Sequence, residues 1–436
     1  MLERYFGLSA HGTTARTEIL AGFTTFLTMA YIVAVNPAIL GEAGMPVGAV
    51  AAATCLAAGI GSILMGLASN TPLALAPGMG LNAYFTYTVV KGMGIAWPTA
   101  LGCVFLSGAV FLVLTLTGVR QLIVGAVPRS LFAAVAAGVG LFIAFIGLKD
   151  AGIIVSNPAT SVGLGDLTAP TAALAIAGLI LIAALQAWNV RAAILVGVAA
   201  TGLAAWALGL APPASHGGGD LSATAFKLDL TGALGLKGGH LAGLLEIVFV
   251  FLFVDLFDNV GTLVAVTKKA GLVAADGTIP RLNRILLVDS VATMVGAAAG
   301  TSTVTSYIES AAGVAAGGRT GLTSVTVGAL FLLTLFAAPL VTRIPTAATA
   351  PALILVGALM VGAIAEVDWS DAKLAVPAFL TLVTIPLTYS IANGLAFGVT
   401  AYAALQLATG NARRQDWLMY VLAALFIARF VWLAKG

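Results

Sequence analysis

The sequence predicts an all-α polytopic membrane protein of fourteen transmembrane segments, arranged as two inverted repeats of seven. Of its 436 residues, 60% are hydrophobic and only 8% are charged, whereas soluble proteins average about 25% charged residues. The charges are spaced so that apolar runs of about twenty residues, the length that crosses a bilayer, lie between them. The basic residues also gather in alternate loops, as they do in membrane proteins with a fixed orientation.

The segments are delimited by charges, prolines and glycines. The first half contains residues 17–36, 47–68, 75–90, 97–117, 129–148, 170–188 and 190–210. The second half contains residues 242–266, 284–300, 301–316, 321–340, 346–364, 374–391 and 393–409. The first run is retained as a segment, because Asn36-Pro37 follows it instead of a small-residue signal-peptidase site.

The longest polar stretch, which contains Pro212-Pro213, divides the fourteen segments into seven and seven. An odd number of segments per half gives the halves opposite orientations, as in inverted-repeat transporters. The predicted domains are the first repeat at 1–210, an exposed extracytoplasmic linker at 211–241, the second repeat at 242–415 and a C-terminal helix at 416–436.

The distribution of basic residues sets the orientation. With the N-terminus inside, thirteen basic residues fall on the inside: Arg4, Arg16, Arg120, Arg129, Arg191, Lys268, Lys269, Arg281, Arg284, Arg319, Lys373, Arg413 and Arg414. Five fall outside: Lys91, Lys149, Lys227, Lys237 and Arg343. The positive-inside rule then predicts that both termini are cytoplasmic, in a cell inner membrane.

Two segments, 75–90 and 301–316, are short and rich in Gly, Ser or Thr, and each is third in its half. Interrupted segments at corresponding positions are the best sequence indication of a transporter's binding site. We expect each to be an extended stretch followed by a half-helix whose first N–H groups are free to meet a ligand. Ordinary kinked helices are the alternative.

Few acidic residues belong inside the membrane. Most lie in loops or at segment ends, where we expect water to solvate them. These are Glu3, Glu18, Glu42, Asp150, Asp166, Asp220, Asp229, Asp276, Glu366, Asp368, Asp371 and Asp416. Glu246 and Asp289 lie nearer segment ends than Asp255, Asp258 and Glu309 do. A carboxylate within the bilayer costs at least about 2.5 kcal/mol, so it usually marks a transport pathway.

Counting along the chain places three polar residues at one depth. Asp258 precedes Lys268 by ten residues and Glu309 precedes Arg319 by ten, which is roughly 15 Å at a helical rise and puts both carboxylates near the midplane. Asn82 reaches a similar depth from the opposite side. Asp255, Asp258 and Thr262 share one helical face; simple hydrogen bonding to neighbouring helices is the alternative role for Asp255 and Asp258.

Other chemistries have little support in the sequence. Cys55 and Cys103 lie inside apolar runs and His11, His216 and His240 lie outside the segments, so we expect no metal site, no cofactor and no histidine relay. The net charge of +3 does not indicate a nucleic-acid partner. Gly394 and Gly398 form a G-x-x-x-G pair that allows close helix approach, with a flexible helix pair as the alternative.

Several long motifs resemble those of the adenine/guanine/hypoxanthine permeases, the AzgA-like branch of the nucleobase:cation symporters. They are the runs from Thr17 to Tyr31, Ala76 to Phe85, Asp255 to Leu263, Gly300 to Gly321 and Pro386 to Gly394. The resemblance implies the uracil-permease fold, with core and gate domains and short antiparallel strands in segments three and ten. It also implies that Asn82, Asp258 and Glu309 are the binding and coupling positions. Thr262 stands where the uracil permease has a histidine.

These features together predict import of a purine nucleobase by cation symport, with a proton as the coupling ion. Glu309 is expected to accept hydrogen bonds from the base and Asp258 to take up the proton, although either carboxylate is a candidate for coupling. The predicted substrate-binding residues are Asn82, Ala83, Phe257, Asp258, Thr262, Ser306, Tyr307 and Glu309. The aromatic wall is left open among Phe257, Tyr84, Phe85 and Tyr307. The predicted partners are the base and the lipid bilayer, and a homodimer is left open.

Three other functions are weighed against this one. Gly163 to Asp166 and Pro351 to Leu353 match short motifs of intramembrane aspartyl proteases, but Asp166 lies in a polar loop. The same fold is also used for anion exchange, but two carboxylates near the midplane disfavour an anion as the substrate. Transport of uracil or xanthine rests on the same residues, and only the family motifs argue against it.

Overall fold

The computed structural model describes residues 2–118, 127–210, 220–236, 241–273, 279–341, 343–411 and 416–433, apart from the side chains of residues 241, 242, 257, 260, 339, 432 and 433. Two compact units can be distinguished. One comprises Met1–Leu116 and Ile146–Leu355, and the other comprises Thr117–Phe145 and Val356–Gly436. Within the described residues, nine helices are long and apolar enough to cross a membrane.

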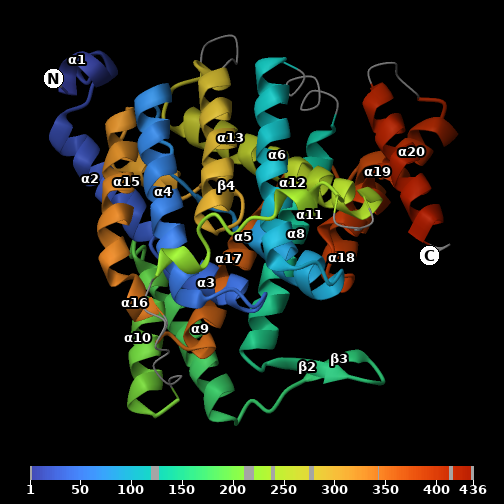
Figure 1. Cartoon of the computed structure of the whole chain (residues 1–436), viewed down its shortest axis with the longest axis horizontal. Helices are drawn as coiled ribbons and strands as arrows, with labels where there is room; N and C mark the ends of the chain where they lie inside the picture. The colour runs from blue at the N-terminus through green and yellow to red at the C-terminus, as the bar shows by residue number, and fades with distance from the viewer. Residues whose placement is uncertain are drawn as a thin grey trace. The chain divides into compact units, whose positions relative to one another are not determined.

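The first half of the chain contributes most of its elements to the first unit (Figure 1). They are α1 (Leu2–Phe6), η1 (Ser9–His11), α2 (Ala15–Met29), α3 (Ile32–Gly41), α4 (Val47–Ser69), β1 (Leu75–Pro77), α5 (Met79–Ala83), the π-helical η2 (Tyr84–Gly92), α6 (Trp97–Leu116), β2 (Ile154–Asn157), β3 (Ser161–Leu164), α9 (Pro170–Ala187) and α10 (Ala193–Ala207). The hairpin of β2 and β3 was not predicted from the sequence.

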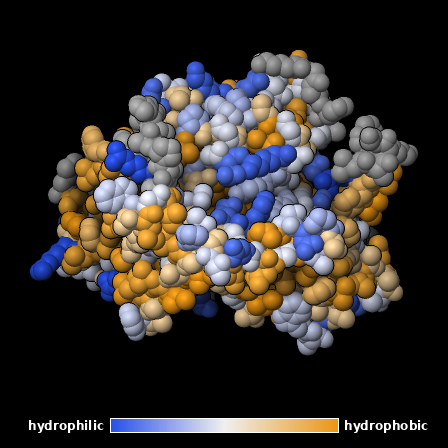
Figure 2. All heavy atoms as spheres, turned by 90° about the horizontal axis from the view of Figure 1, so that it is seen from below, coloured by the Kyte–Doolittle hydropathy of each residue, from blue (hydrophilic) through white to orange (hydrophobic). Residues whose placement is uncertain are grey.

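The second half supplies the remaining elements of this unit. They are η3 (Leu221–Ala223), α11 (Leu230–Ala233), α12 (Leu241–Lys269), α13 (Leu282–Ala299), β4 (Val304–Ser306), α14 (Ser310–Ala315), α15 (Gly321–Thr334), η4 (Leu335–Ala337) and α16 (Ala338–Val341). Hydrophobic residues form broad orange areas on the surface seen in Figure 2, and α10 exposes Leu203 and Trp206 by 68% and 72%. Such helices suit a lipid environment.

The two halves interlock in a reciprocal way. Helix α4, second in its half, packs against α15, fourth in the other half, and α13 packs against α6 in the same relation. Small residues allow both approaches: a Cβ on Gly59 would lie 2.6 Å from Leu332, and one on Gly108 would lie 3.0 Å from Met294. This exchange of equivalent helices is what inverted repeats produce.

The third and tenth segments meet as a pair of short strands. Strands β1 and β4 are antiparallel, with Leu75 opposite Ser306 and Pro77 opposite Val304. Hydrogen bonds from Gly78 N to Thr303 O, 2.9 Å, and from Tyr307 N to Ala74 O, 3.0 Å, extend the ladder at each end. Both segments therefore have the predicted extended start, and the alternative of ordinary kinked helices is wrong.

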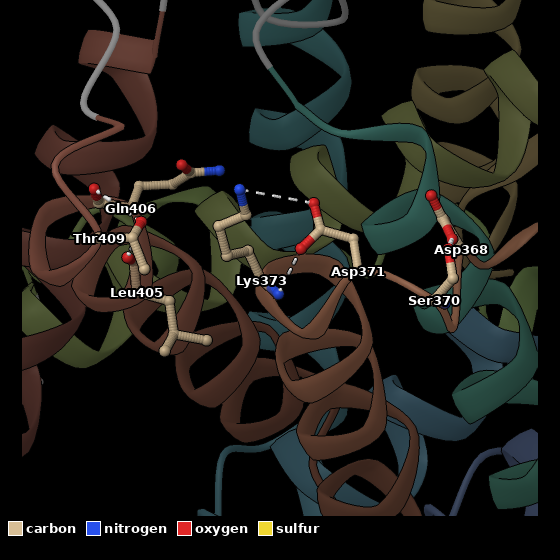
Figure 3. Close-up of polar contacts among 7 residues, drawn as sticks. All are labelled: Asp368, Ser370, Asp371, Lys373, Leu405, Gln406 and Thr409. Carbon is tan, nitrogen blue, oxygen red and sulfur yellow. Dashed lines mark hydrogen bonds and ion pairs between the residues drawn. The ribbon is translucent and has the colours of Figure 1, made fainter.

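The second unit contains parts of α8 (Arg129–Asp150) and α17 (Thr346–Val361), followed by η5 (Gly362–Glu366), α18 (Ala372–Leu387), α19 (Ile391–Ala408) and α20 (Trp417–Leu433). A Cβ on Gly394 would overlap Ile385, and one on Gly398 would overlap Thr381 Oγ1. The G-x-x-x-G pair therefore serves close approach of α18 and α19. Figure 3 shows the start of α18, where the Asp371 side chain accepts a hydrogen bond from Lys373 N at 2.9 Å.

The expectation that Glu18 is solvated is wrong. Its side chain is 0% exposed, and it accepts hydrogen bonds from Arg319 N (2.8 Å), Thr320 N (3.2 Å) and Thr323 Oγ1 (2.6 Å). The first N–H groups of a helix have no partners within it. Glu18 of α2 supplies an acceptor for the N–H groups at the start of α15. It therefore joins the first segment to the eleventh.

The predicted linker is folded where the structure describes it. Residues 211–219 and 237–240 lie outside the described part, but residues 220–236 contain η3 and α11. Asp229 N donates to Pro98 O at 2.8 Å, and Phe226 N donates to Ala298 O at 2.7 Å. This part of the linker is therefore attached to the ends of α6 and α13.

Candidate functional site

The break in the third segment places Asn82 in the interior. Gly78 has an extended backbone, with φ −73° and ψ 119°, and α5 begins directly after it. Asn82 is 0% exposed, and its Oδ1 accepts a hydrogen bond from Ser302 Oγ. Its Nδ2 has no partner among the described residues. A buried amide with two unused donors is suited to receive an acceptor group from a ligand.

The eighth segment brings Asp258 to the same break. Asp258 Oδ2 lies 3.8 Å from the position of a Cβ on Gly78. Asp258 is partly exposed, while Asp255 and Thr262 on the same helical face are 3% and 8% exposed. Asp258 thus reaches the broken third segment. The side chain of Phe257 lies outside the described residues.

The break in the tenth segment carries Glu309, which directly precedes α14 and is partly exposed. Glu309 Oε1 accepts a hydrogen bond of 2.7 Å from Tyr31 Oη. In the described part of the chain, no donor reaches Oε2. One oxygen of this carboxylate is therefore held by the protein, and the other remains available.

Ser306 is the last residue of strand β4, and Tyr307 follows it on the way to Glu309. Tyr307 is 6% exposed and donates its hydroxyl hydrogen to Pro77 O, so it joins segment ten to segment three. Ser306 is 2% exposed, and its hydroxyl has no partner among the described residues. Ala83, the last residue of α5, is fully buried.

The side chains of Asp258, Tyr307 and Glu309 form one electrostatic cluster. Asp258 is close enough to Glu309 for the two carboxylates to repel each other, and Tyr307 interacts with both. Asn82, by contrast, is hydrogen-bonded to Ser302 rather than to either carboxylate. The structure thus brings together two acids that are 51 positions apart, as their numbers in the sequence show.

Tyr31 is a member of this cluster that the sequence reading missed. It is 0% exposed and lies between α2 and α3, where the first segment is interrupted. Its residue type carries little signal, since a tyrosine within an apolar segment is common in protein interiors. Only its position in the motif from Thr17 to Tyr31 pointed toward this region.

The described residues do not form a metal site or a second acidic pair that includes Asp166. Among the described residues, no group of three His, Cys, Asp or Glu side chains is arranged to hold a metal ion. Asp166 is exposed; the side-chain and backbone hydrogen bonds from Thr168 lower the pKa of its carboxyl group. Such an acid, ionised and bound to its own turn, is not part of a catalytic pair.

Sequence comparison relates the chain to known permeases. A permease of Methanocaldococcus jannaschii is 51% identical over 99% of both chains. Adenine permease AdeP of Escherichia coli is 47% identical over 99% of this chain and 96% of its own. Guanine/hypoxanthine permease PbuG of Bacillus subtilis is 43% identical over 99% of this chain and 100% of its own.

Solved structures share the fold. The transmembrane domain of the cyanobacterial bicarbonate transporter BicA has a TM-score of 0.66 at 17% identity, covering 87% of this chain and 97% of that one. The murine anion transporter Slc26a9 has a TM-score of 0.64 at 11% identity, covering 91% and 69%. These likenesses confirm the predicted fold class of fourteen segments in two inverted sevens.

The match to a family covers most of the chain. Residues 16–397 match the Permease family (Xan_ur_permease), which includes both predicted carboxylates and the two broken segments. The chain therefore belongs to the Permease family and is a multi-pass membrane transporter rather than an enzyme.

Proposed function

We propose that this protein imports a purine nucleobase, adenine, guanine or hypoxanthine, together with a proton across a cell inner membrane. Two of the relatives named above are an adenine permease and a guanine/hypoxanthine permease, each matched over 99% of this chain. The observation that carries the proposal is the meeting of Asp258 and Glu309 at the breaks of segments three and ten.

A purine base is neutral and flat, with N–H donors and ring-nitrogen or carbonyl acceptors along its edges. Glu309 Oε2 and the Asp258 carboxylate can accept from the N–H groups of the base. Asn82 Nδ2 can donate to an acceptor, and Ser306 Oγ can do either. A site that fills its unused polar atoms with a ligand discriminates strongly against molecules that lack the matching groups.

We assign proton coupling to Asp258. An ionised carboxylate within the membrane is costly, and among the described residues Asp258 has neither an ion pair nor a hydrogen bond. A proton on Asp258 removes one of two neighbouring negative charges. It leaves Glu309 ionised, as an acceptor for the base, so that proton and base bind together.

The predicted orientation has both termini and thirteen basic residues facing the cytoplasm, and import is movement of the base toward that side. Symport down a proton gradient then moves the base in the same direction. Both the sidedness and the coupling ion are parts of the proposal that transport measurements can examine separately.

The test uses the purified full-length protein in proteoliposomes. An imposed inward proton gradient should drive accumulation of radiolabelled adenine, guanine or hypoxanthine, and a protonophore should abolish it. Excess unlabelled adenine, guanine or hypoxanthine should compete, whereas uracil, xanthine, bicarbonate and sulfate should not. Accumulation driven by sodium alone would contradict the proton as the coupling ion. Competition only by uracil, xanthine or an anion would contradict adenine, guanine and hypoxanthine as the substrates. In intact cells, termini that are accessible from outside the inner membrane would contradict the orientation.

A further inference from the structure

We propose that Tyr31 is a positioning residue that gives the two oxygens of Glu309 different tasks. In this assignment Tyr31 holds Oε1, and Oε2 alone accepts a hydrogen bond from an N–H group of the transported base. The inference deepens the proposed function and rests on it. It extends the site to the first segment, from which neither the sequence nor the comparisons assign a residue.

The hydrogen bond between the two side chains has a fixed direction. A tyrosine hydroxyl has one hydrogen to donate, and an ionised carboxylate can only accept. The Oη to Oε1 distance is 2.7 Å, a length typical of strong O–H···O bonds. Tyr31 therefore occupies Oε1 for as long as Glu309 is ionised.

Burial makes this contact a rigid one. Tyr31 is 0% exposed, and the backbone around it is fixed: Val33 N donates to Ala30 O at 3.2 Å, and Ala34 N donates to Tyr31 O at 3.0 Å. A tyrosine ring has only two rotatable side-chain bonds, so its hydroxyl is a well-defined anchor. The longer Glu309 side chain is then oriented by the anchor rather than by its own preferences.

Glu309 has few other restraints. Its side chain does not cap α14, and its other oxygen has no donor among the described residues. Without the Tyr31 hydroxyl the carboxylate could rotate and present either oxygen at several angles. Because binding depends on groups held in place before the ligand arrives, loss of the anchor should weaken binding while the carboxylate itself remains.

The first test is equilibrium binding of radiolabelled hypoxanthine or adenine to the purified protein, together with uptake in proteoliposomes. Tyr31→Phe removes only the hydroxyl. We expect its Kd and KM to rise roughly three- to tenfold, about the effect of part of one charge-assisted hydrogen bond, with the maximal uptake rate within about twofold of the wild type. Tyr5→Phe is the matched control, since its hydroxyl binds Leu67 O at 2.8 Å on an exposed residue.

The second test asks whether Tyr31 acts through Glu309. Glu309→Asp keeps a carboxylate but shortens the side chain away from Tyr31, and Glu309→Ala removes the group. In both backgrounds, Tyr31→Phe should change the Kd less than twofold, which is the non-additive result expected of residues acting as one unit. An undiminished effect in these backgrounds would overturn the proposal, and so would a wild-type Kd in Tyr31→Phe itself.

Two other outcomes are also decisive. If Tyr31→Phe lowers the yield of folded protein but leaves the Kd of the folded fraction unchanged, Tyr31 is a structural residue and the proposal is wrong. If the wild type binds no purine, the proposed function fails, and the assignment of Oε2 to a base fails with it. If the wild type binds purine and Tyr31→Phe binds it with the same Kd, the role of Tyr31 is rejected and the proposed function is not.

Discussion

The Asp258 side chain lies directly against Gly78, with its Oδ2 atom 3.8 Å from the position that a Cβ would occupy on that glycine. The two residues belong to opposite halves of the chain. Gly78 is the point at which strand β1 turns into helix α5. The acid to which we assign the proton is therefore in contact with the part of segment three that leads to Asn82.

Substitution Gly78→Ala should impair transport without unfolding the protein. The backbone angles of Gly78 are available to any residue, but the methyl group would lie 3.0 Å from Thr305 Cγ2 and face Asp258. We expect uptake to fall about tenfold. Gly362→Ala is the control, because a Cβ there meets nothing within 4 Å. Equal uptake by the two variants would argue against a functional contact at Gly78.

Asp258→Asn should uncouple transport from the proton gradient. The amide resembles the protonated acid in shape and charge but cannot release a proton. We expect purine exchange across the membrane to continue while accumulation driven by an inward proton gradient falls to the level of simple equilibration. Counterflow measures the exchange and gradient-driven uptake measures the accumulation, and both can be measured on the same proteoliposomes. Undiminished accumulation with the wild-type proton dependence would remove Asp258 from coupling.

Glu18→Ala should destabilise the protein. The substitution leaves the N–H groups of Arg319 and Thr320 and the hydroxyl of Thr323 without their shared acceptor. Loss of hydrogen bonds to a buried charged group costs about 3 kcal/mol, which should lower the thermal unfolding midpoint in detergent by several degrees. Glu3→Ala, which removes one exposed bond to Ser9 N, should change the midpoint little; similar losses would show that burial of Glu18 is unimportant.

Gly398→Ala should loosen the contact of α18 with α19. The added methyl would overlap Thr381 Oγ1, which itself donates to Pro377 O at 2.9 Å. Overfilling a close-packed contact costs about 1–3 kcal/mol. Thermal unfolding in detergent should show a lower midpoint than for Gly362→Ala. The double variant Gly398→Ala, Thr381→Ala should recover part of the loss if this overlap is its cause.

Asp368 provides a pH-dependent contact ahead of α18, visible in Figure 3. Hydrogen bonds from Ser370 Oγ (2.6 Å) and Ser370 N (3.0 Å) lower the pKa of its carboxyl group from 3.8. Its contribution to stability is therefore complete above about pH 4 and is lost as pH falls through the lower pKa of the folded state. Ser370→Ala should reduce the unfolding midpoint slightly at pH 7, by an amount that shrinks toward pH 3.

The matched control for that measurement is Thr409→Val. The Thr409 hydroxyl donates to Leu405 O at 2.8 Å, a bond between uncharged groups that no acid titrates. Its effect on the midpoint should be the same at both pH values. An effect of Ser370→Ala that is equally independent of pH would show that the charge on Asp368 is not involved.

The sequence predicts a common depth for the two central acids from residue counting alone. A helical rise counted from Lys268 and from Arg319 puts Asp258 and Glu309 near one level. In the structure the helix that follows Glu309 ends at Ala315, and the two carboxylates are near enough to repel each other. The broken segments could also be predicted from the sequence, since Gly, Pro and β-branched residues disfavour a continuous helix. The residues of each segment do not by themselves identify the partner strand; that expectation came from the family resemblance.

Glu18 and Tyr31 show where such reasoning fails. An acid near the end of a segment has the same local sequence whether water or another helix surrounds it. Only the approach of α15 decides that Glu18 is buried. The bond from Tyr31 to Glu309 likewise joins residues 278 positions apart, and no local pattern encodes such a pairing.

The pairing of β1 with β4 also sets the order of events during biosynthesis. When the ribosome has completed the first seven segments, strand β1 has no partner strand. Ser62 of the same half can bond both backbone groups of Leu75, but lipid offers no partner to the remaining polar groups of the strand. Strand β4 is synthesised only after α12 and α13. The nascent third segment must therefore wait in water or against the insertion machinery until the tenth arrives, so the two halves mature together rather than in turn.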